Sequence, residues 1–229
     1  MRINKYISET GYCSRRETDR LITANRITIN GVVCKPGDTV GPNDVVLIDG
    51  KAIPEKAESV YIALNKPIGI TCTAAKEVNG NIINFVNYPS RIFPIGRLDK
   101  DSEGLILLTN DGDIVNKIMR SENGHGKEYV VTVDRPITDK FIQAMSSGVE
   151  ILGVTTKPCK VYRINEYEFR IILTQGLNRQ IRRMCKALGN KVVRLERIRI
   201  MNIHLEGIGK GQWRDLTNEE LQMLLAQLK

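Results

Sequence analysis

The sequence has few of the residues from which metal centres, disulfide frameworks and nucleotide-cofactor sites are built. It contains two histidines, His125 and His204, and five cysteines that lie far apart and form no CxxC pair. Zinc sites and disulfide frameworks require closer, paired spacing, so we predict reduced thiols and no metal. The glycine patterns of P-loops and Rossmann folds are also missing, as is the GxSxG pattern of serine hydrolases. We therefore expect no nucleotide cofactor and no serine-type catalysis.

Long apolar runs are absent too. No stretch reaches the roughly 18 consecutive apolar residues of a membrane-spanning helix, and residues 1–17 include no apolar signal core. We therefore expect a cytoplasmic protein with no membrane partner. The chain has 229 residues, of which 41% are hydrophobic. This is enough for one small and one medium domain with hydrophobic cores, and we expect the chain to be a monomer.

The net charge of +8 is concentrated in two parts of the chain. One is the N-terminal segment with Arg15, Arg16 and Arg20. The other is residues 179–199, where eight lysines and arginines accompany a single carboxylate, Glu196. Such concentration is typical of a nucleic-acid-binding surface. Aromatic residues make up only 5% of the chain, so base stacking cannot be the main source of affinity.

The first fifty residues predict a compact unit of two helices followed by short strands. "RINKYISET" predicts the first helix, and "SRRETDRLITAN" predicts the second, with Ser14 and Glu17 as a capping box. "RITING" and "VVLIDG" have the alternating or apolar pattern of strands. The polar segment that follows, residues 50–59, is interpreted as a linker. We therefore expect one domain over residues 1–58 and a second over residues 59–229.

The second part of the chain mixes strand-like and helix-like segments in no regular order. Its strands and helices are not spaced as repeated βαβ units. We therefore predict an α+β fold with a mixed, largely antiparallel sheet and flanking helices. Strands are expected over residues 60–65, 104–109, 127–134, 169–174 and 195–205, and helices over residues 113–120, 138–148, 178–189 and 217–229.

The helix expected over residues 178–189 has an apolar face and an opposite face with four cations. These cations are Arg179, Arg182, Arg183 and Lys186, and no carboxylate is spaced to pair with them. Arg179 is expected in the first helical turn, where the helix dipole disfavours a positive charge. A solvated face is one interpretation of this pattern. The other is that an anion lies opposite, either a phosphate backbone or a carboxylate.

The segment "GRLDKDSEG" brings Asp99, Asp101 and Glu103 close together. A calcium loop of this spacing would need a glutamate at its twelfth position, where the chain has Asn110. A metal loop is therefore rejected. Two interpretations remain from the residues alone. The segment is a tight charged turn in which Gly104 permits an unusual φ, or it carries a reactive aspartate with an arginine partner.

Together these segments resemble a known family. "RINKYISETGYCSRRETDRLI" followed by "ITING" resembles an S4-type RNA-binding domain. "ALNKPIGI", "FPIGRLDKDSEGLILLTNDGD", "KEYVVTV" and "LTQGLNRQIRRMCKALG" resemble the motifs of the rRNA pseudouridine synthases of the small-subunit and large-subunit type, in the family's order. The variants "TQGLNRQIRRMC" and "RIMNI" most resemble the F branch of the large-subunit synthases. The resemblance spans essentially the whole chain.

The resemblance implies roles for individual residues. Asp99 matches the catalytic aspartate, and Arg182 matches the arginine that pairs with it. Tyr129 matches the tyrosine that lies against the flipped uracil, and Arg97 matches the residue that helps to displace the base. Asp101 and Glu103 are then turn residues, and Gly104 is a backbone requirement. The remaining candidates for contacts with RNA are Arg15, Arg16, Arg20, Arg179, Arg183 and Lys186.

The function that the resemblance implies is isomerisation of a specific uridine to pseudouridine in 23S rRNA, with a tRNA uridine as an additional candidate. No atoms enter or leave in this reaction, so no cofactor is required. A base inside a helix must be flipped out at a cost of a few kcal/mol. One alternative is a non-catalytic, ribosome-associated S4 RNA-binding protein. Another is an RNA glycosidase, which would use a similar carboxylate but release the free base.

Overall fold

The computed structural model describes residues 1–75, 77–119 and 124–228, and the chain divides into two compact units. Two short segments of the first unit come from the part of the chain that the sequence assigns to the second domain. The first unit contains Met1–Val60, Tyr88–Ile92 and Asn110–Gly112, and the second contains Tyr61–Asn87, Phe93–Thr109 and Asp113–Lys229.

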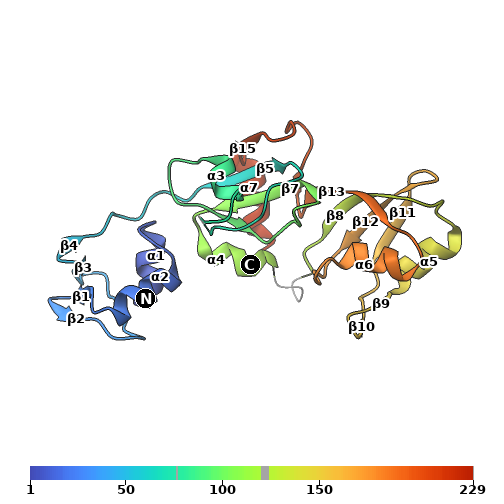
Figure 1. Ribbon diagram of the computed structural model, residues 1–229. Helices are drawn as coiled ribbons and strands as arrows, with labels where there is room; N and C mark the ends of the chain where they lie inside the picture. The colour runs from blue at the N-terminus through green and yellow to red at the C-terminus, as the bar shows by residue number, and fades with distance from the viewer. Residues whose placement is uncertain (76, 120–123, 229) are drawn as a thin grey trace. The chain divides into compact units, whose positions relative to one another are not determined.

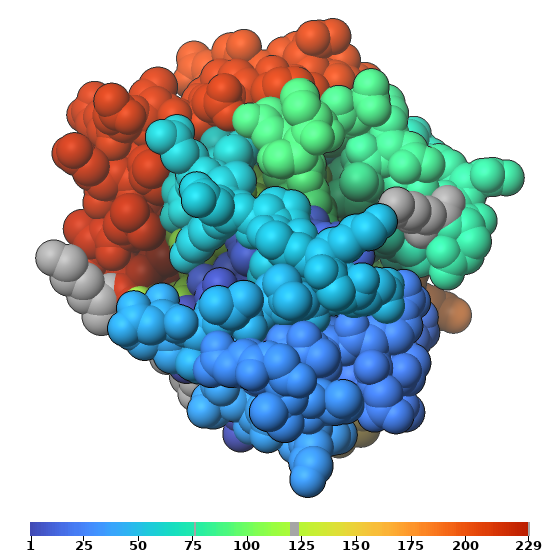
Figure 2. Space-filling model, turned by 90° about the vertical axis from the view of Figure 1, so that its left-hand side faces the viewer, coloured from blue at the N-terminus to red at the C-terminus, as the bar shows by residue number. Residues whose placement is uncertain are grey.

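The first unit consists of two helices and a four-stranded antiparallel sheet (Figure 1). Ser14 begins the second helix as predicted, because its hydroxyl accepts a hydrogen bond from the N–H of Glu17 at 3.1 Å. Ile7, Leu21 and Ile27 are buried in the core of this unit, whose outer surface is drawn in blue in Figure 2. Its elements are α1 (Ile3–Glu9), α2 (Arg15–Thr23), β1 (Ile27–Ile29), β2 (Val32–Val33), β3 (Val46–Ile48) and β4 (Lys51–Ala52), in the sheet order β2-β1-β3-β4.

The segment predicted to be a linker begins with regular structure. Lys51 and Ala52 form β4, which pairs antiparallel with β3. Farther along, Lys56 makes an ion pair with Glu9 of α1 at 3.0 Å. The polar composition of residues 50–59 predicted an irregular segment, but short edge strands are often polar and charged, so they lack the apolar pattern of inner strands.

The second unit is built on a nine-stranded sheet, and most of its strands are labelled in Figure 1. Within the described residues every pairing in this sheet is antiparallel except that of β7 with β13. The predicted α+β fold with a mixed, largely antiparallel sheet is therefore confirmed. The sheet order is β11-β12-β8-β13-β7-β5-β15, with β14 paired to β13 and β6 to β7. The strands are β5 (Tyr61–Lys66), β6 (Phe93–Ile95), β7 (Glu103–Thr109), β8 (Lys127–Val133), β11 (Lys160–Arg163), β12 (Glu168–Leu173), β13 (Val192–Ile200), β14 (Ile203–His204) and β15 (Trp213–Asp215).

Two hydrophobic clusters hold helices against this sheet. Val131 and Phe169 of the sheet pack in one cluster with Phe141 of α5 and Met184 of α6. The other cluster joins β5 and β7 to α4 and α7. The four predicted helices are confirmed, although Arg120 and Lys229 at the ends of two predicted ranges lie outside the described residues. The remaining elements are α3 (Ile82–Val86), α4 (Gly112–Met119), α5 (Asp139–Ser147), α6 (Gln180–Ala187) and α7 (Asn218–Ala226), with a small hairpin of β9 (Glu150–Ile151) and β10 (Val154–Thr155).

The parallel pairing of β7 with β13 requires a glycine at position 104. Gly104 lies opposite Arg197 in this pairing and has a φ of +100°. A Cβ atom at this position would lie far inside van der Waals contact with the backbone carbonyl oxygen of Arg197. The predicted backbone requirement at Gly104 is therefore confirmed. It is both a conformational requirement and a packing requirement.

Candidate active site

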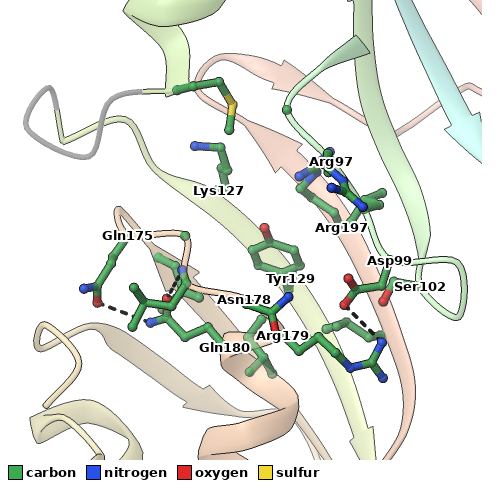
Figure 3. Close-up of a pocket in the computed structure, with 18 residues that line it drawn as sticks. Arg97, Asp99, Ser102, Lys127, Tyr129, Gln175, Asn178, Arg179, Gln180 and Arg197 are labelled. Carbon is green, nitrogen blue, oxygen red and sulfur yellow. Dashed lines mark hydrogen bonds and ion pairs between the residues drawn. The ribbon is translucent and has the colours of Figure 1, made fainter. Parts of the chain in front are cut away.

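A short turn between β6 and β7 carries Arg97 and Asp99. The turn is closed by a hydrogen bond from the N–H of Ser102 to the carbonyl oxygen of Asp99 at 3.0 Å. Leu98, the residue between them in the sequence, is buried, and its N–H donates to Sγ of Cys72 at 3.4 Å. The buried neighbour and the closed turn fix the backbone, so the side chains of Arg97 and Asp99 are held at the edge of a cavity (Figure 3).

This cavity has a volume of about 570 Å³ and is enclosed by segments that are far apart in the sequence. The β6–β7 turn, strands β8 and β13, residues 175–179 and the start of α6 all contribute to its lining. The volume is in the range of ligand-binding clefts. Among the described residues that line it, Asp99 supplies the only carboxylate.

The carboxylate of Asp99 faces Arg179. Its Oδ2 lies 3.6 Å from Nη1 of Arg179, and about a third of the Asp99 side chain is exposed. Arg179 also donates two hydrogen bonds to the carboxylate of Asp101, at 3.0 and 2.7 Å. These bonds raise the pKa of Arg179 and lower the pKa of Asp101. Asp101 therefore holds the guanidinium that faces Asp99.

Arg182 does not pair with Asp99, contrary to the prediction. Its Nη2 donates to the backbone oxygen of Asp101 at 2.8 Å and to Oγ of Ser102 at 3.1 Å. Its Nε lies 3.5 Å from the Asp101 carboxylate. The physical reason is the backbone of Arg179, which has a left-handed φ of 49° immediately before α6 and turns that side chain toward the turn. Arg182 is one helical turn farther along and holds the backbone of the turn.

The four cations of α6 and its N-terminus do not form one solvent-facing strip. Arg179 precedes the helix instead of lying in its first turn, and the Arg182 side chain is only 14% exposed. Arg183 and Lys186 are exposed. Arg183 donates to the carbonyl and side-chain oxygens of Asn178 at 3.0 and 3.1 Å. Lys186 has no ion pair within the described part of the chain.

Tyr129 lies in the wall of the cavity, next to a residue that the sequence did not identify. In the pairing of β8 with β13, Tyr129 lies opposite Arg197, whose guanidinium carbon is 6.0 Å from the centre of the tyrosine ring. Arg197 is 2% exposed, and its Nε donates to the carbonyl oxygen of Leu105 at 2.6 Å. Strand alternation was an available signal, because Arg197 shares a face with the buried Leu195.

Lys127 is a second lining residue that the sequence did not identify. It precedes Tyr129 by two positions in β8, so both side chains lie on the same face of the strand. Burial, and then the charge of Arg197, lower the pKa of Lys127 to about 8. This side of the cavity therefore contains two partly or fully buried cations beside a tyrosine ring (Figure 3).

Asp101 and Glu103 are more than turn residues. Glu103 begins β7 and is 2% exposed. Its carboxylate makes ion pairs of 2.7 Å with Arg194 and of 2.7 Å with Lys210. Burial raises the pKa of Glu103, but the hydrogen bonds and charges of Lys210 and Arg194 together lower it by more than burial raises it. The net shift of this pKa is therefore downward. The two carboxylates thus hold cations from distant segments around the turn that carries Asp99.

The other predicted site residues lie at exposed positions. Arg97 lines the cavity and is exposed. Arg15, Arg16 and Arg20 are exposed on α2 in the first unit, where Arg20 makes an ion pair with Glu17 at 3.0 Å. Residues 1–75, 77–119 and 124–228 contain no metal-binding cluster of histidine, cysteine or acidic residues. They also contain no helix that is long and apolar enough to cross a membrane, and no disulfide.

The family is decided by comparison with known proteins. A family model described as RNA pseudouridylate synthase matches residues 60–187, and a model of the S4 domain matches residues 1–46. The chain belongs to the RNA pseudouridylate synthase family. It is an isomerase, and the predicted enzyme class is confirmed.

Two relatives and one solved structure show how far the synthase resembles known members. It is 58% identical to the dual-specificity RNA pseudouridine synthase RluF of Escherichia coli (strain K12), over 96% of this chain and 77% of that protein. It is 33% identical to the ribosomal large subunit pseudouridine synthase B of Bacillus subtilis (strain 168), over 98% and 96% of the two chains. A crystal structure of a pseudouridylate synthase superposes with a TM-score of 0.73 at 31% identity, over 98% of this chain and 99% of that one.

Proposed function

We propose that this synthase converts specific uridines of large-subunit rRNA and tRNA to pseudouridine, with Asp99 as its catalytic residue. One observation carries the proposal: Asp99 supplies the only carboxylate among the described residues of the cavity, and it faces Arg179 at 3.6 Å. The name of the E. coli relative, a dual-specificity synthase, supports two classes of RNA substrate. The name of the B. subtilis relative supports the large ribosomal subunit.

The reaction breaks the bond between N1 of uracil and C1′ of ribose and joins C5 to the same carbon. The base gains a proton at N1 and loses one at C5, so the composition of the RNA is unchanged. The Asp99 carboxylate acts on this nucleotide, and Arg179 keeps it oriented. Tyr129 supplies the ring against which the flipped base lies, and Arg182 fixes the backbone of the turn. The chemistry requires neither a metal nor a nucleotide cofactor.

Binding of the RNA is assigned to the exposed cations. Arg97 is exposed at the cavity, where a long planar side chain can take the place of a flipped base. Arg179 provides a further positive charge at the cavity, and Arg183 and Lys186 provide two more on α6. Arg15, Arg16 and Arg20 of the S4 domain provide a second set of phosphate contacts. We propose that the synthase acts as a monomer in the cytoplasm, where these RNAs are found.

Nucleoside analysis of the products tests this function. The purified protein is incubated with transcribed large-subunit rRNA and, separately, with tRNA, and each RNA is digested to nucleosides. We expect pseudouridine to increase as uridine decreases, with no free uracil. Release of free uracil would indicate a glycosidase, and unchanged RNA in both incubations, despite binding, would contradict the proposal. Loss of a mapped pseudouridine in a strain without the gene then identifies the target.

A further inference from the structure

Two cations beside Tyr129 lack a described counter-charge in the cavity. Arg197 is 2% exposed, and its Nη2 is buried with no hydrogen-bond partner among the described residues. Its Nε is already bonded to the carbonyl oxygen of Leu105. The ammonium group of Lys127 makes no hydrogen bond or ion pair within that part of the chain, and Lys127 lines the same cavity as Arg197. A buried guanidinium N–H without an acceptor is unfavourable in the free protein.

The charges of the cavity do not compensate for this pair. Its lining contains Arg97, Lys127, Arg179 and Arg197, and Asp99 is the only carboxylate among the described residues. Asp99 already faces Arg179. The side of the cavity next to Tyr129 is therefore positively charged, with the Lys127 ammonium and the Arg197 guanidinium in its lining. A ligand that supplies oxygen acceptors or negative charge at this point relieves the unfavourable burial.

The base of the target nucleotide is the part of the RNA that fits this position. A flipped nucleotide enters a pocket base first, while its phosphates remain connected to the strand outside. Exposed cations such as Arg183 and Lys186 are available to those phosphates, whereas Arg197 is buried. The ring of Tyr129 lies next to Arg197 and indicates where a planar base would rest. The acceptors that reach this depth are the carbonyl oxygens of uracil.

We propose that Arg197 and Lys127 bind the O2 and O4 oxygens of the target uracil and stabilise the negative charge of the base while it is detached from ribose. This inference rests on the proposed function. When the C1′–N1 bond breaks, its electron pair stays with the base and is shared among N1, O2 and O4. Buried donors aimed at such a charge are the most effective kind of electrostatic catalyst. The base then forms the C5–C1′ bond, loses its C5 proton and gains one at N1.

The symmetry of uracil allows one pair of donors to serve before and after the base turns. Rotation by half a turn about the axis through N3 and C6 exchanges N1 with C5 and O2 with O4. A cation that contacts one oxygen before the rotation therefore meets the other oxygen afterwards. Figure 3 shows Arg197 of β13 and Lys127 of β8 on opposite sides of Tyr129, so each cation is placed to contact one oxygen of a base that lies against this ring. The detached base is thus retained while it changes orientation.

Substrates with different leaving groups test this inference. Lys127→Met and Arg197→Gln are compared with the unmodified synthase on RNA that carries uridine or 5-fluorouridine at the mapped target. Fluorine withdraws electrons and stabilises the departing base by itself. Arg199→Gln is the matched control, because Arg199 lies on the same strand and pairs with Glu128 at 2.6 Å but does not line the cavity. The rate of loss of the original nucleoside is measured in a single turnover.

We expect each cavity variant to lose about 100-fold in rate with uridine, and to lose markedly less with 5-fluorouridine. Equal losses with both substrates would overturn the inference, because a structural or binding role affects both alike. Melting curves check the fold, and Lys127→Met alone decides the outcome if Arg197→Gln is unfolded. Full activity of Lys127→Met would also overturn it. If the unmodified synthase converts no uridine, the failure belongs to the proposed function instead.

Discussion

Oδ2 of Asp99 lies 3.6 Å from Nη1 of Arg179, and the same guanidinium is bound by both carboxylate oxygens of Asp101. Arg179 therefore connects the β6–β7 turn with the segment before α6. Its left-handed backbone, with a φ of 49°, makes this connection possible. Asp101 fixes the arginine by two short hydrogen bonds, while the longer contact leaves Asp99 available to a substrate.

Removal of Arg179 should impair turnover more than folding. We expect Arg179→Ala to lower the single-turnover rate by about 10- to 100-fold, because a small displacement of a catalytic group has effects of this size. Asp101→Asn should lower the rate less, since it weakens only the anchor of Arg179. Arg163→Ala is the control, because Arg163 pairs with Asp139 at 2.9 Å and does not line the cavity. An unchanged rate for Arg179→Ala would contradict this assignment.

Gly104→Ala should destabilise the second unit through two effects. The left-handed backbone costs a substituted residue about 1–2 kcal/mol, and the new Cβ meets the carbonyl oxygen of Arg197. Overpacking of this kind adds about 1–3 kcal/mol. Gly153→Ala is the matched control, because Gly153 has a φ of +74° but no atom within 4 Å of its Cβ position. Denaturant unfolding measures both variants, and equal losses of stability would show that β7 and β13 are not tightly joined here.

The long apolar strands were predictable because each has a pattern that few other structures satisfy. Residues 62–64 of β5 and 105–108 of β7 are aliphatic runs that are buried on both faces of the sheet. Phe93–Ile95 and Trp213–Asp215 were missed because a strand of three residues is too short to show alternation. Residues 195–205 were expected as one strand, but Met201 has a φ of +53°, which divides it into two.

The candidate site was only partly predictable from the sequence. Asp99 and Tyr129 were identified by their place in family motifs, and both line the cavity. The contact of Asp99 with Arg179 could not be predicted, because it depends on the backbone conformation of one residue and on the meeting of two distant segments. Arg197 was counted as part of a basic surface. Its burial follows from the tertiary position of β13, which charge alone does not indicate.

The pH dependence of the reaction should report the charge of Lys127. Burial and the charge of Arg197 lower the pKa of Lys127 to about 8, so raising the pH through this value removes its positive charge. We expect kcat/KM to fall above about pH 8, because this parameter follows the ionisation of the free enzyme. Lys127→Arg should retain activity and shift the fall to higher pH, since a guanidinium stays charged.

His125, two residues before Lys127, leaves this interpretation unchanged. Burial, followed by the charge of Lys127, lowers the pKa of His125, so this histidine is already neutral at pH 8. The measurement is the pH profile of kcat/KM at limiting RNA for both proteins. A falling limb at the same pH in Lys127→Arg would show that another group, or the RNA itself, is responsible.

The salt dependence of RNA binding should identify the cations that contact phosphates. Arg183→Ala and Lys186→Ala should each weaken binding and reduce the salt slope by about one charge. Arg214→Ala is the control, because Arg214 is held by two hydrogen bonds to Glu220 at 2.7 and 2.8 Å. Its slope should not change. Titrations of the same RNA at several salt concentrations give these slopes, and an unchanged slope for Lys186→Ala would place that side chain away from the RNA.

Replacement of Asp99 tests the central claim most directly. A strain without the gene is complemented with either the unmodified synthase or Asp99→Asn, and pseudouridines in rRNA and tRNA are mapped by primer extension after carbodiimide treatment. We predict that the unmodified protein restores the missing pseudouridine, whereas Asp99→Asn binds the RNA with unchanged affinity and restores none. Restoration by Asp99→Asn, or persistence of every pseudouridine in the strain without the gene, would contradict the account.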